Sequence, residues 1–308
     1  MQRDLPKVLV VGTNPWREDG TAHTLKKIFE CWKPSKLTLI YTKSGLPYTN
    51  VASRFFQISE NQVLKNILKP WKIIGQEVES TEVVDKSLTQ EEEARYAKAH
   101  KKHSMVLTLC REFVWLFGHW RGKALRNFVA DFNPDILFIP IYPTVYMGWI
   151  QRYVLKHTKK PFVCYLADDN YTYDSCSGIL SYIHRFWLRK NVRWLATHCS
   201  QMYVIVEKEK EDTDSRFGTD SLILTKGIDF TNKPYNPHPL NKPIKFVYTG
   251  SLIIGRDKTL ALIADAINEI NNDGKKAELD IYSKDVPMDE IMARLNNSAS
   301  QQIGRAHV

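Results

Sequence analysis

Short apolar runs alternate with longer amphipathic segments through the first three quarters of the chain. The apolar runs have the length of β-strands and are apolar on both faces. We expect strands at Lys7 to Gly12, Lys36 to Tyr41, Ile136 to Pro140, Phe162 to Leu166, Met202 to Val206 and Leu222 to Thr225. The segments between them predict helices at Thr24 to Trp32, Tyr146 to Lys156, Tyr182 to Trp194 and Glu207 to Phe217. This order predicts βαβ units around a parallel sheet in an α/β fold.

The segment between Asn61 and Asp131 has a helical period throughout, which predicts a helical insertion on the sheet at about 61–131. Its second half, Ser104 to Val129, is amphipathic and mixes aromatic with basic side chains. That mixture suits the surface of an anionic membrane. The pattern favours the alternative, a helix with one face in the core and a solvated basic face.

A stretch rich in Pro and Asn, Asn232 to Pro243, predicts a linker between two domains. The first domain then covers 1–231, the linker 232–243, and a second domain 244–302. The second begins with a strand at Phe246 to Tyr248, a helix from Leu260 to Asn271 and a strand at Glu278 to Tyr282. These elements make up about half of a doubly wound domain.

The last six residues, Ile303 to Val308, match a translation of a common sequencing adapter. We therefore expect a non-native tail at 303–308 and a natural chain cut near Gln302, which would leave the second domain truncated. A genuine tail is the alternative.

Composition narrows the classes of partner. The formal charge of +9 calls for an anionic partner, and nucleic acid, anionic lipid and nucleotide phosphates all qualify. Five scattered cysteines without a CxxC motif fit reduced residues better than disulfides or a zinc site. The longest apolar tract, Ile136 to Ile150, is interrupted by Pro140 and Pro143 and is too short for a bilayer span. We expect a cytosolic chain.

The loop after the first strand of the second domain has the chemistry of a diphosphate site. Gly250 and Ser251 end the strand, and Arg256 and Lys258 precede a helix. Backbone N–H groups at a helix start and two cations favour an anion, and Arg can hold a diphosphate by two parallel hydrogen bonds. The alternative is a solvated basic loop.

The loop after the first strand, Gly12 to Thr21, can let a ligand approach closely, with Gly20 and Thr21 facing it. It lacks GxGxxG, so a dinucleotide is not expected. A plain turn is the alternative.

Two further loops follow strands at the edge where open α/β sheets bind ligands. Asp168 and Asp169 could orient an acceptor hydroxyl or accept its proton, or one could cap the next turn while the other is solvated. Lys226, Gly227 and Asp229 follow a later strand, and Gly227 would permit a turn with positive φ. No other Asp, Glu or His completes a metal site with the acidic pair.

Together these segments resemble a GT-B glycosyltransferase, specifically the retaining family 4 that builds bacterial surface polysaccharides. The likeness rests on the first strand and loop, the tract Arg111 to Phe138, the KGID turn at Lys226 to Asp229, and the start of the second domain, YTGSLIIGRDKTL. It covers nearly the whole chain to about Tyr282. The implied fold is GT-B-like, with a complete N-terminal Rossmann-like domain and the truncated start of a second.

The resemblance implies a nucleotide-diphosphate sugar held mainly by the second domain and a glycan or lipid-linked acceptor on the first. Arg256 and Lys258 align with the diphosphate-binding cations of the family, and Gly20 with its glycine loop. No cofactor and no metal are implied. The implied location is cytoplasmic, with peripheral contact at the inner face of an anionic membrane.

Three departures from the family stand out. Lys226 replaces the usual Asn, the acidic pair stands where a His is common, and the C-terminal paired glutamates are missing. We therefore expect this chain to have little activity by itself. A non-catalytic nucleotide-sugar-binding protein is the alternative from another class. Nucleic acid is not expected as a partner, because no interleaved aromatic and basic repeat occurs.

Overall fold

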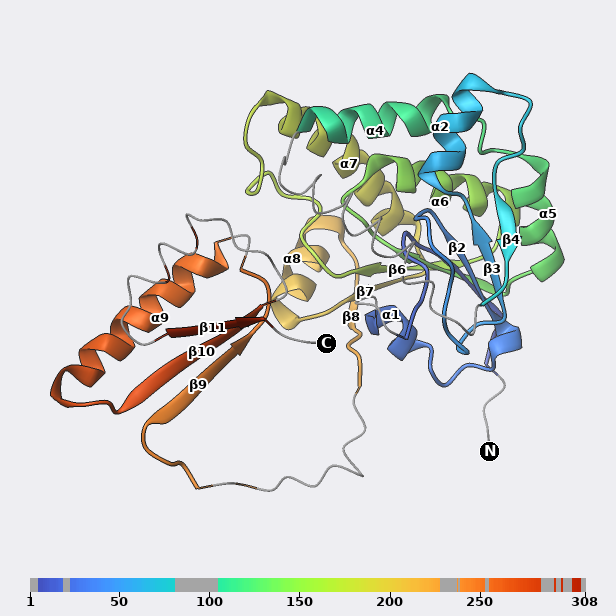
Figure 1. The fold of residues 1–308 in the computed structure, drawn as a ribbon. Coiled ribbons are helices and arrows are strands. Elements are labelled where there is room, and N and C mark those ends of the chain that lie inside the picture. Colours follow the sequence, from blue (N-terminus) through green and yellow to red (C-terminus); the bar gives the residue numbers. More distant parts are fainter. Residues whose placement is uncertain are drawn as a thin grey trace. The chain divides into compact units, whose positions relative to one another are not determined.

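The structure is a computed structural model that describes residues 5–18, 23–80, 105–227, 237, 239–252, 255–283, 291, 295 and 301–305. The chain divides into two units, Met1–Ile228 and Asp229–Val308, and each is described by itself. Figure 1 shows the first unit in blue to yellow and the second in orange to red.

An eight-stranded sheet forms the middle of the first unit. Its strands are β1 (Val8–Val11), β2 (Leu37–Tyr41), β3 (Arg54–Gln57), β4 (Gln76–Val78), β5 (Ile136–Pro140), β6 (Phe162–Leu166), β7 (Gln201–Val204) and β8 (Leu222–Ile223). The spatial order is β4-β3-β2-β1-β5-β6-β7-β8, and only the edge strand β4 runs antiparallel to its neighbour. The expected α/β fold with a parallel sheet is confirmed.

Strands are added to one side of β1 first and to its other side afterwards. Val8 pairs with Leu37 of β2 on one side and with Ile136 of β5 on the other. The chain builds outward from β1 through β2 and β3, and then builds the other way through β5 to β8. This is the strand order of a doubly wound, Rossmann-like fold, and the carboxyl ends of β1 and β5 mark its topological switch point.

Two strands of this sheet were not expected from the sequence. β3 precedes the segment assigned to the helical insertion, and β4 lies inside it, so the expectation of an all-helical 61–131 is wrong at Gln76–Val78. The β4 sequence, QEV, is short and mostly polar because it forms an exposed edge. Such a strand has no apolar run that a sequence pattern could detect.

Helices cover both faces of the sheet (Figure 1). They are α1 (His23–Ile28), α2 (Glu60–Leu68), α4 (Met105–Phe117), α5 (Lys123–Phe132), α6 (Val145–Thr158), α7 (Ile179–His198) and α8 (Glu207–Phe217), with a 3-10 turn at Pro34–Lys36. Alternate strand residues enter two cores: Leu9 joins a core with α4 to α7, whereas Val8 joins a smaller core with Phe29 after α1. This two-sided burial explains why the strands are apolar throughout.

The single amphipathic helix expected at Ser104 to Val129 is two helices, α4 and α5. The break begins at Gly118, where a Cβ would lie 2.2 Å from a side-chain atom of Val63, and α5 begins after Gly122. Gly118 therefore permits close packing of α4 against α2. Helix ends elsewhere follow local signals: Ser59 and Gln62 form a capping box on α2, and Gly218 ends α8 with φ 69°.

The second unit has a three-stranded parallel sheet in the order β11-β10-β9. Its elements are β9 (Ile244–Thr249), α9 (Arg256–Ile270), a 3-10 turn at Asn271–Asp273, β10 (Ala277–Ser283) and β11 (Gln301–Arg305). α9 buries Leu260, Ala264 and Ile267 against β10. β11 includes Ile303 to Arg305, the first residues of the segment regarded above as foreign. Half of the expected linker, residues 232–236 and 238, lies outside the described residues.

Candidate functional site

A cavity of about 190 Å³ lies at the switch point of the first unit. Residues at the carboxyl ends of β1, β5 and β6 line it, together with α1: Gly12, Asn14, Trp16, Thr24, Leu25, Pro140, Ile141, Tyr142, Tyr165 and Ala167. Open α/β sheets bind their ligands at this position, because the loops diverge there. We therefore take this cavity as the candidate site of the first unit.

Tyr142 is the main polar group in this cavity. A Cβ on Gly12 would lie 3.1 Å from its hydroxyl oxygen, so the glycine leaves room for the phenol. Burial raises the pKa of Tyr142 to about 12, although hydrogen bonds with Thr13 oppose the shift. Tyr142 is thus a neutral phenol at physiological pH, able to donate a hydrogen bond to a ligand.

The start of α6, just beyond Tyr142, is already occupied by a carboxylate. Glu112 of α4 is buried, and its Oε1 and Oε2 accept the N–H groups of Val145 and Tyr146 at 2.9 and 2.6 Å. Nε2 of His184 lies 3.1 Å from Glu112 Oε1. A helix start attracts anions, but here the protein supplies the anion itself. This helix end is therefore closed to a phosphate.

The two aspartates after β6, Asp168 and Asp169, have different environments. Oδ1 of Asp169 accepts the N–H groups of Tyr171 and Thr172, each at 2.9 Å, and Oδ2 accepts the Thr172 hydroxyl. Burial opposes ionisation of Asp169, but these hydrogen bonds and the charge of Arg185 outweigh it and lower its pKa. Asp168 is exposed. The structure thus places Asp169 in the turn and leaves Asp168 exposed, directly after Ala167 of the cavity lining.

Three arginines spaced one turn apart on α7 hold this loop. Arg185 donates to the carbonyl oxygen of Asp169 at 3.2 Å, and Arg189 to that of Tyr171 at 2.7 Å. Arg193 donates to the Tyr171 hydroxyl at 2.7 Å, and the Arg189 guanidinium lies 3.9 Å from the centre of the Tyr171 ring. This spacing places all three on one helix face. The loop that carries Asp168 is therefore fixed in place.

Glu209, near the start of α8, is a third carboxyl group near the acidic pair. Burial raises its pKa, and the charges of Asp168 and Asp169 raise it further, against a hydrogen bond from the N–H of Ile205. No sequence pattern singles out Glu209, because it lies in a helix rich in charged residues. Tyr142 and Glu112 were missed for a similar reason, since their roles depend on contacts across the fold.

Other residues expected at the site lie elsewhere. Lys226 and Gly227 follow β8 and are exposed; β8 is four strands from β1, about 19 Å at the usual spacing. Gly227 does not have the positive φ that was expected. Gly20, Thr21 and Asp229 lie outside the described residues.

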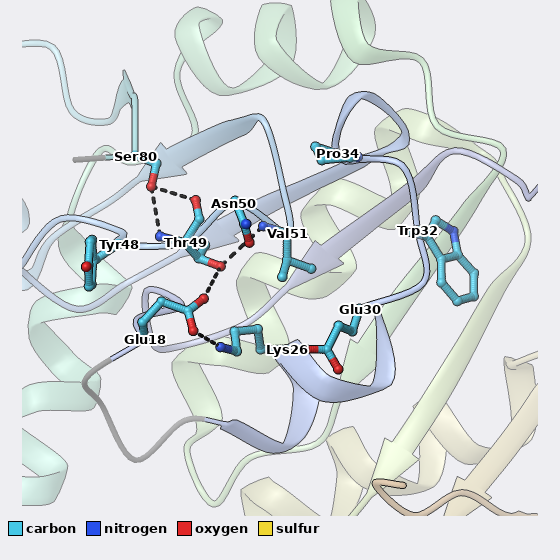
Figure 2. Close-up of a pocket in the computed structure, with 10 residues that line it drawn as sticks. All are labelled: Glu18, Lys26, Glu30, Trp32, Pro34, Tyr48, Thr49, Asn50, Val51 and Ser80. Atoms are coloured by element: carbon cyan, nitrogen blue, oxygen red, sulfur yellow. Dashed lines mark hydrogen bonds and ion pairs between the residues drawn. The ribbon is translucent and has the colours of Figure 1, made fainter. Parts of the chain in front are cut away.

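A larger cavity, about 890 Å³, is lined by residues of the loop after β1, of α1 and of the loop before β3 (Figure 2). Lys26 pairs with Glu18, and the hydroxyl of Thr49 donates to Glu18 at 3.1 Å. Ser80 accepts the N–H of Thr49 and donates to its carbonyl oxygen. These polar groups satisfy one another, and the cavity lies away from the switch point. Size alone therefore does not make it the better candidate.

The loop after β9 in the second unit is shaped by a close contact. A Cβ on Gly250 would lie 2.8 Å from the Tyr248 hydroxyl, which donates to the carbonyl oxygen of Ser251 at 2.7 Å. The N–H of Gly250 donates to the carbonyl oxygen of Tyr282 at 3.0 Å. Gly250 is thus required by the packing of the loop. Ser251 contributes its backbone carbonyl, which accepts the hydrogen bond from Tyr248.

Helix α9 starts with two exposed cations. Gly255 precedes it with φ 77° and provides no side-chain cap, and Arg256 and Lys258 lie in its first turn. Within the described part of the second unit, neither cation has a hydrogen-bond or ion-pair partner. The sequence predicted both residues in a loop before a helix from Leu260, but α9 already begins at Arg256, and the two cations stand on either side of the buried Asp257. Whether they bind a diphosphate stays a prediction.

The residues that the structure describes contain no group of three or more His, Cys, Asp or Glu able to hold a metal ion. Nor does any described helix have the length and apolar content needed to cross a membrane.

A scan against models of protein families finds no match to this chain, and a search of curated proteins finds none. Among solved structures, a putative UDP-N-acetylglucosamine 2-epimerase from Listeria monocytogenes is similar with 12% identity and a TM-score of 0.43, over 96% of this chain and 67% of that one. A structure of S. aureus MnaA with UDP has 10% identity and a TM-score of 0.40, over 97% and 69%. Similarities this weak support no conclusion about function, and the α/β fold stands on the chain's own strand order.

Proposed function

We propose that this chain is part of a GT-B glycosyltransferase that resembles retaining family 4. It would transfer a sugar from a nucleoside diphosphate to a glycan or lipid-linked acceptor in the synthesis of cell-surface polysaccharide. In such a transfer, the bond between the anomeric carbon and the diphosphate oxygen breaks as the acceptor oxygen bonds to that carbon. The hydroxyl proton leaves with a base or with the departing phosphate.

The observation that carries the proposal is the start of α9. Arg256 and Lys258 are exposed cations in the first turn of a helix whose Gly255 provides no side-chain cap. The partial positive charge of the helix start and both side chains favour a diphosphate, whose charge rises as the sugar leaves. In the first unit the corresponding position at α6 is filled by Glu112.

We assign the acceptor to the switch-point cavity of the first unit. Asp168 would orient the acceptor hydroxyl or accept its proton, while Asp169 holds the turn that positions it. Tyr142 would donate to an acceptor oxygen. Lys226, Gly227 and Asp229, like Gly20 and Thr21, stay predicted contacts of the ligand.

The binding half of the proposal is tested by titration calorimetry of the full chain with UDP, GDP and ADP. We expect one of them to bind with one site per chain. Arg256→Ala should weaken that binding at least about tenfold, because a bidentate contact to a charged group contributes roughly 1.5–3 kcal/mol. The matched control is Lys275→Ala, which removes an exposed cation from the same unit and should leave affinity unchanged. Absence of binding by all three nucleotides contradicts the proposal.

The transfer half is tested by following release of nucleoside diphosphate from activated sugars in the presence of lipid-linked acceptors. The assay compares this chain with a form extended by a C-terminal segment that carries paired glutamates, because the resemblance implies that such a pair holds the donor sugar. Activity of the extended form should fall strongly in Asp168→Asn. Binding without transfer in both forms would instead support a non-catalytic nucleotide-sugar-binding protein.

A further inference from the structure

Two cysteines of the first unit come together at the end of α7. Cys164 lies in the middle of β6 and is fully buried, and Cys199 follows the last residue of α7, just before β7. They are far apart in the sequence, so no CxxC spacing marks them as a pair. The fold joins them because β6 and β7 are neighbours in the sheet and α7 is the crossover between them.

Hydrogen bonds hold both sulfur atoms against the last turn of α7. Sγ of Cys164 lies 3.8 Å from the carbonyl oxygen of Leu195, and Sγ of Cys199 lies 3.4 Å from that of Ala196, the next residue. The N–H of Cys199 donates to the same Leu195 carbonyl at 3.0 Å. Cys199 also packs against the core that contains Cys164, and the two thiols interact directly by a hydrogen bond.

The two thiols differ in exposure and in acidity. Cys164 has no exposed surface, whereas Cys199 is half-buried between the exposed His198 and Ser200. The hydrogen bond from Cys164 lowers the pKa of Cys199, against the effect of its own partial burial. Burial raises the pKa of Cys164 well above its ordinary value. An accessible cysteine that ionises readily beside a buried thiol is the arrangement of a reactive cysteine and its resolving partner.

We propose that Cys199 and Cys164 form a modification site at which hydrogen peroxide converts the two thiols into a reversible disulfide. The inference goes beyond the proposed sugar transfer and does not depend on it, because neither cysteine lines the switch-point cavity or belongs to the second unit. The sequence pattern favoured reduced cysteines, and the chain stays reduced here until peroxide is present.

The oxidation proceeds in two steps. The thiolate of Cys199 attacks one oxygen of hydrogen peroxide, the O–O bond breaks, and hydroxide leaves and takes up a proton, which gives a sulfenic acid and water. The sulfur of Cys164 then attacks the sulfur of Cys199, and the S–O bond breaks. The departing hydroxide takes the thiol proton of Cys164 and becomes a second water. The two thiols lose two electrons in total, and one peroxide is reduced to two waters.

The disulfide would join two elements that support the candidate site. β6 leads into the loop of Asp168 and Asp169, and α7 carries the arginines that hold this loop. Oxidation would therefore cross-link the frame of the loop without placing a new group in the cavity.

Peroxide treatment of a chain with only this pair of cysteines tests the proposal. The variant C31S/C110S/C176S retains Cys164 and Cys199. After peroxide, removal of peroxide by catalase and alkylation in denaturant, we expect loss of both thiols and a mass decrease of about 2 Da, from the two hydrogens removed. Peptide mapping should show the cross-link between the two residues, and dithiothreitol should restore both thiols. A covalent dimer on a non-reducing gel, or a chain that keeps both thiols, contradicts the proposal.

Single variants separate the two roles. In C199S, oxidation of Cys164 should slow at least about tenfold, because a buried neutral thiol has almost no thiolate to react. In C164S, Cys199 should go on to sulfinic acid, a mass increase of about 32 Da that dithiothreitol does not reverse. The matched control is C176S: Cys176 is also half-buried, but its sulfur donates to the carbonyl oxygen of Ser181, so the cross-link should form as in the unchanged chain.

Equal oxidation of Cys164 with and without Cys199 would show that the two thiols do not act as a pair, and the proposal would be wrong. Sulfinic acid at Cys199 in the chain that retains Cys164 would overturn it as well, since the resolving step would then be absent. Urea unfolding checks that each variant folds. If C164S or the triple variant does not fold, peptide mapping of the unchanged chain and of C199S gives the same decision.

Discussion

The loop after β6 and the loop after β9 begin alike and end differently. Each follows a parallel strand at its carboxyl end, and each has two residues of like charge, in the loop itself after β6 and in the first turn of α9 after β9. In the first loop, Asp169 accepts three hydrogen bonds within its own turn, and arginines of α7 hold the backbone. In the second, Arg256 and Lys258 are exposed, and within the described residues no side chain pairs with them.

The difference separates charged side chains that are paired within the protein from charged side chains that are open to a ligand. A carboxylate that caps its own turn contributes to stability, and its removal is felt in folding. An exposed cation without a partner contributes little to folding, so its removal should be felt in binding alone. In the first unit, the carboxylates of Asp169 and Glu112 are both satisfied by groups of the protein. The comparison therefore makes opposite predictions for stability in the two units.

The largest effect is expected at Glu112. Glu112→Ala leaves the N–H groups of Val145 and Tyr146, and His184, without their buried partner. We expect the free energy of unfolding to fall by about 3 kcal/mol, since several buried polar groups lose their hydrogen bonds at once. Urea denaturation followed by circular dichroism measures it. Glu60→Ala, which removes a partly exposed partner of Arg111, is the control and should cost less than about 1 kcal/mol.

A smaller effect separates the two aspartates. Asp169→Ala should destabilise the chain by about 1.5 kcal/mol, because the N–H groups of Tyr171 and Thr172 lose their acceptor. Asp168→Ala should change stability by less than about 0.5 kcal/mol. Since the pKa of Asp169 is lowered by folding, its contribution is present above the unfolded pKa of about 3.9 and is lost as the pH falls below it. Equal losses in both variants would refute the division of roles.

Glu209→Gln should act in the opposite direction. The pKa of Glu209 is raised by burial and by the neighbouring aspartates, so its charged form is less favourable in the folded chain. The folded state therefore loses stability as the pH rises through that pKa, and glutamine removes the loss. We expect a gain of about 0.5 kcal/mol at pH 7 that disappears near pH 3, where the carboxyl is protonated in both states. Thermal unfolding at the two pH values measures it, and a gain independent of pH would contradict the explanation.

The sequence predicted the parallel sheet well, because strands buried on both faces are apolar without interruption. The helix Glu207–Phe217 has the expected bounds, and its end at Gly218 follows from a left-handed residue that glycine adopts readily. The polar edge strand β4 could not be predicted, since its stability comes from pairing with β3. The break between α4 and α5 at Gly118 could not be predicted either. The need for glycine there comes from close contact with Val63, which is distant in the sequence.

For the candidate site, the sequence located the loops but could not assign the side chains within them. Strand order placed Asp168 and Asp169 at the correct edge of the sheet. Which of the two caps the turn depends on backbone geometry, and the pattern left that open. Glu112 comes from a helix far from the switch point in the sequence, so no local spacing connects it to α6. Contacts of this kind are properties of the folded chain.

The smallest change in stability is expected where the change in binding is largest. Arg256→Gln with Lys258→Gln should alter the free energy of unfolding by less than about 0.5 kcal/mol, because both side chains are exposed and have no partner among the described residues. The same double variant should weaken nucleoside diphosphate binding beyond the roughly tenfold loss of Arg256→Ala alone, since the remaining point charge is also removed. Urea unfolding and titration calorimetry on one preparation measure both quantities. A loss of stability as large as that of Asp169→Ala would make the two cations part of the fold, and the contrast between the two loops would then no longer hold.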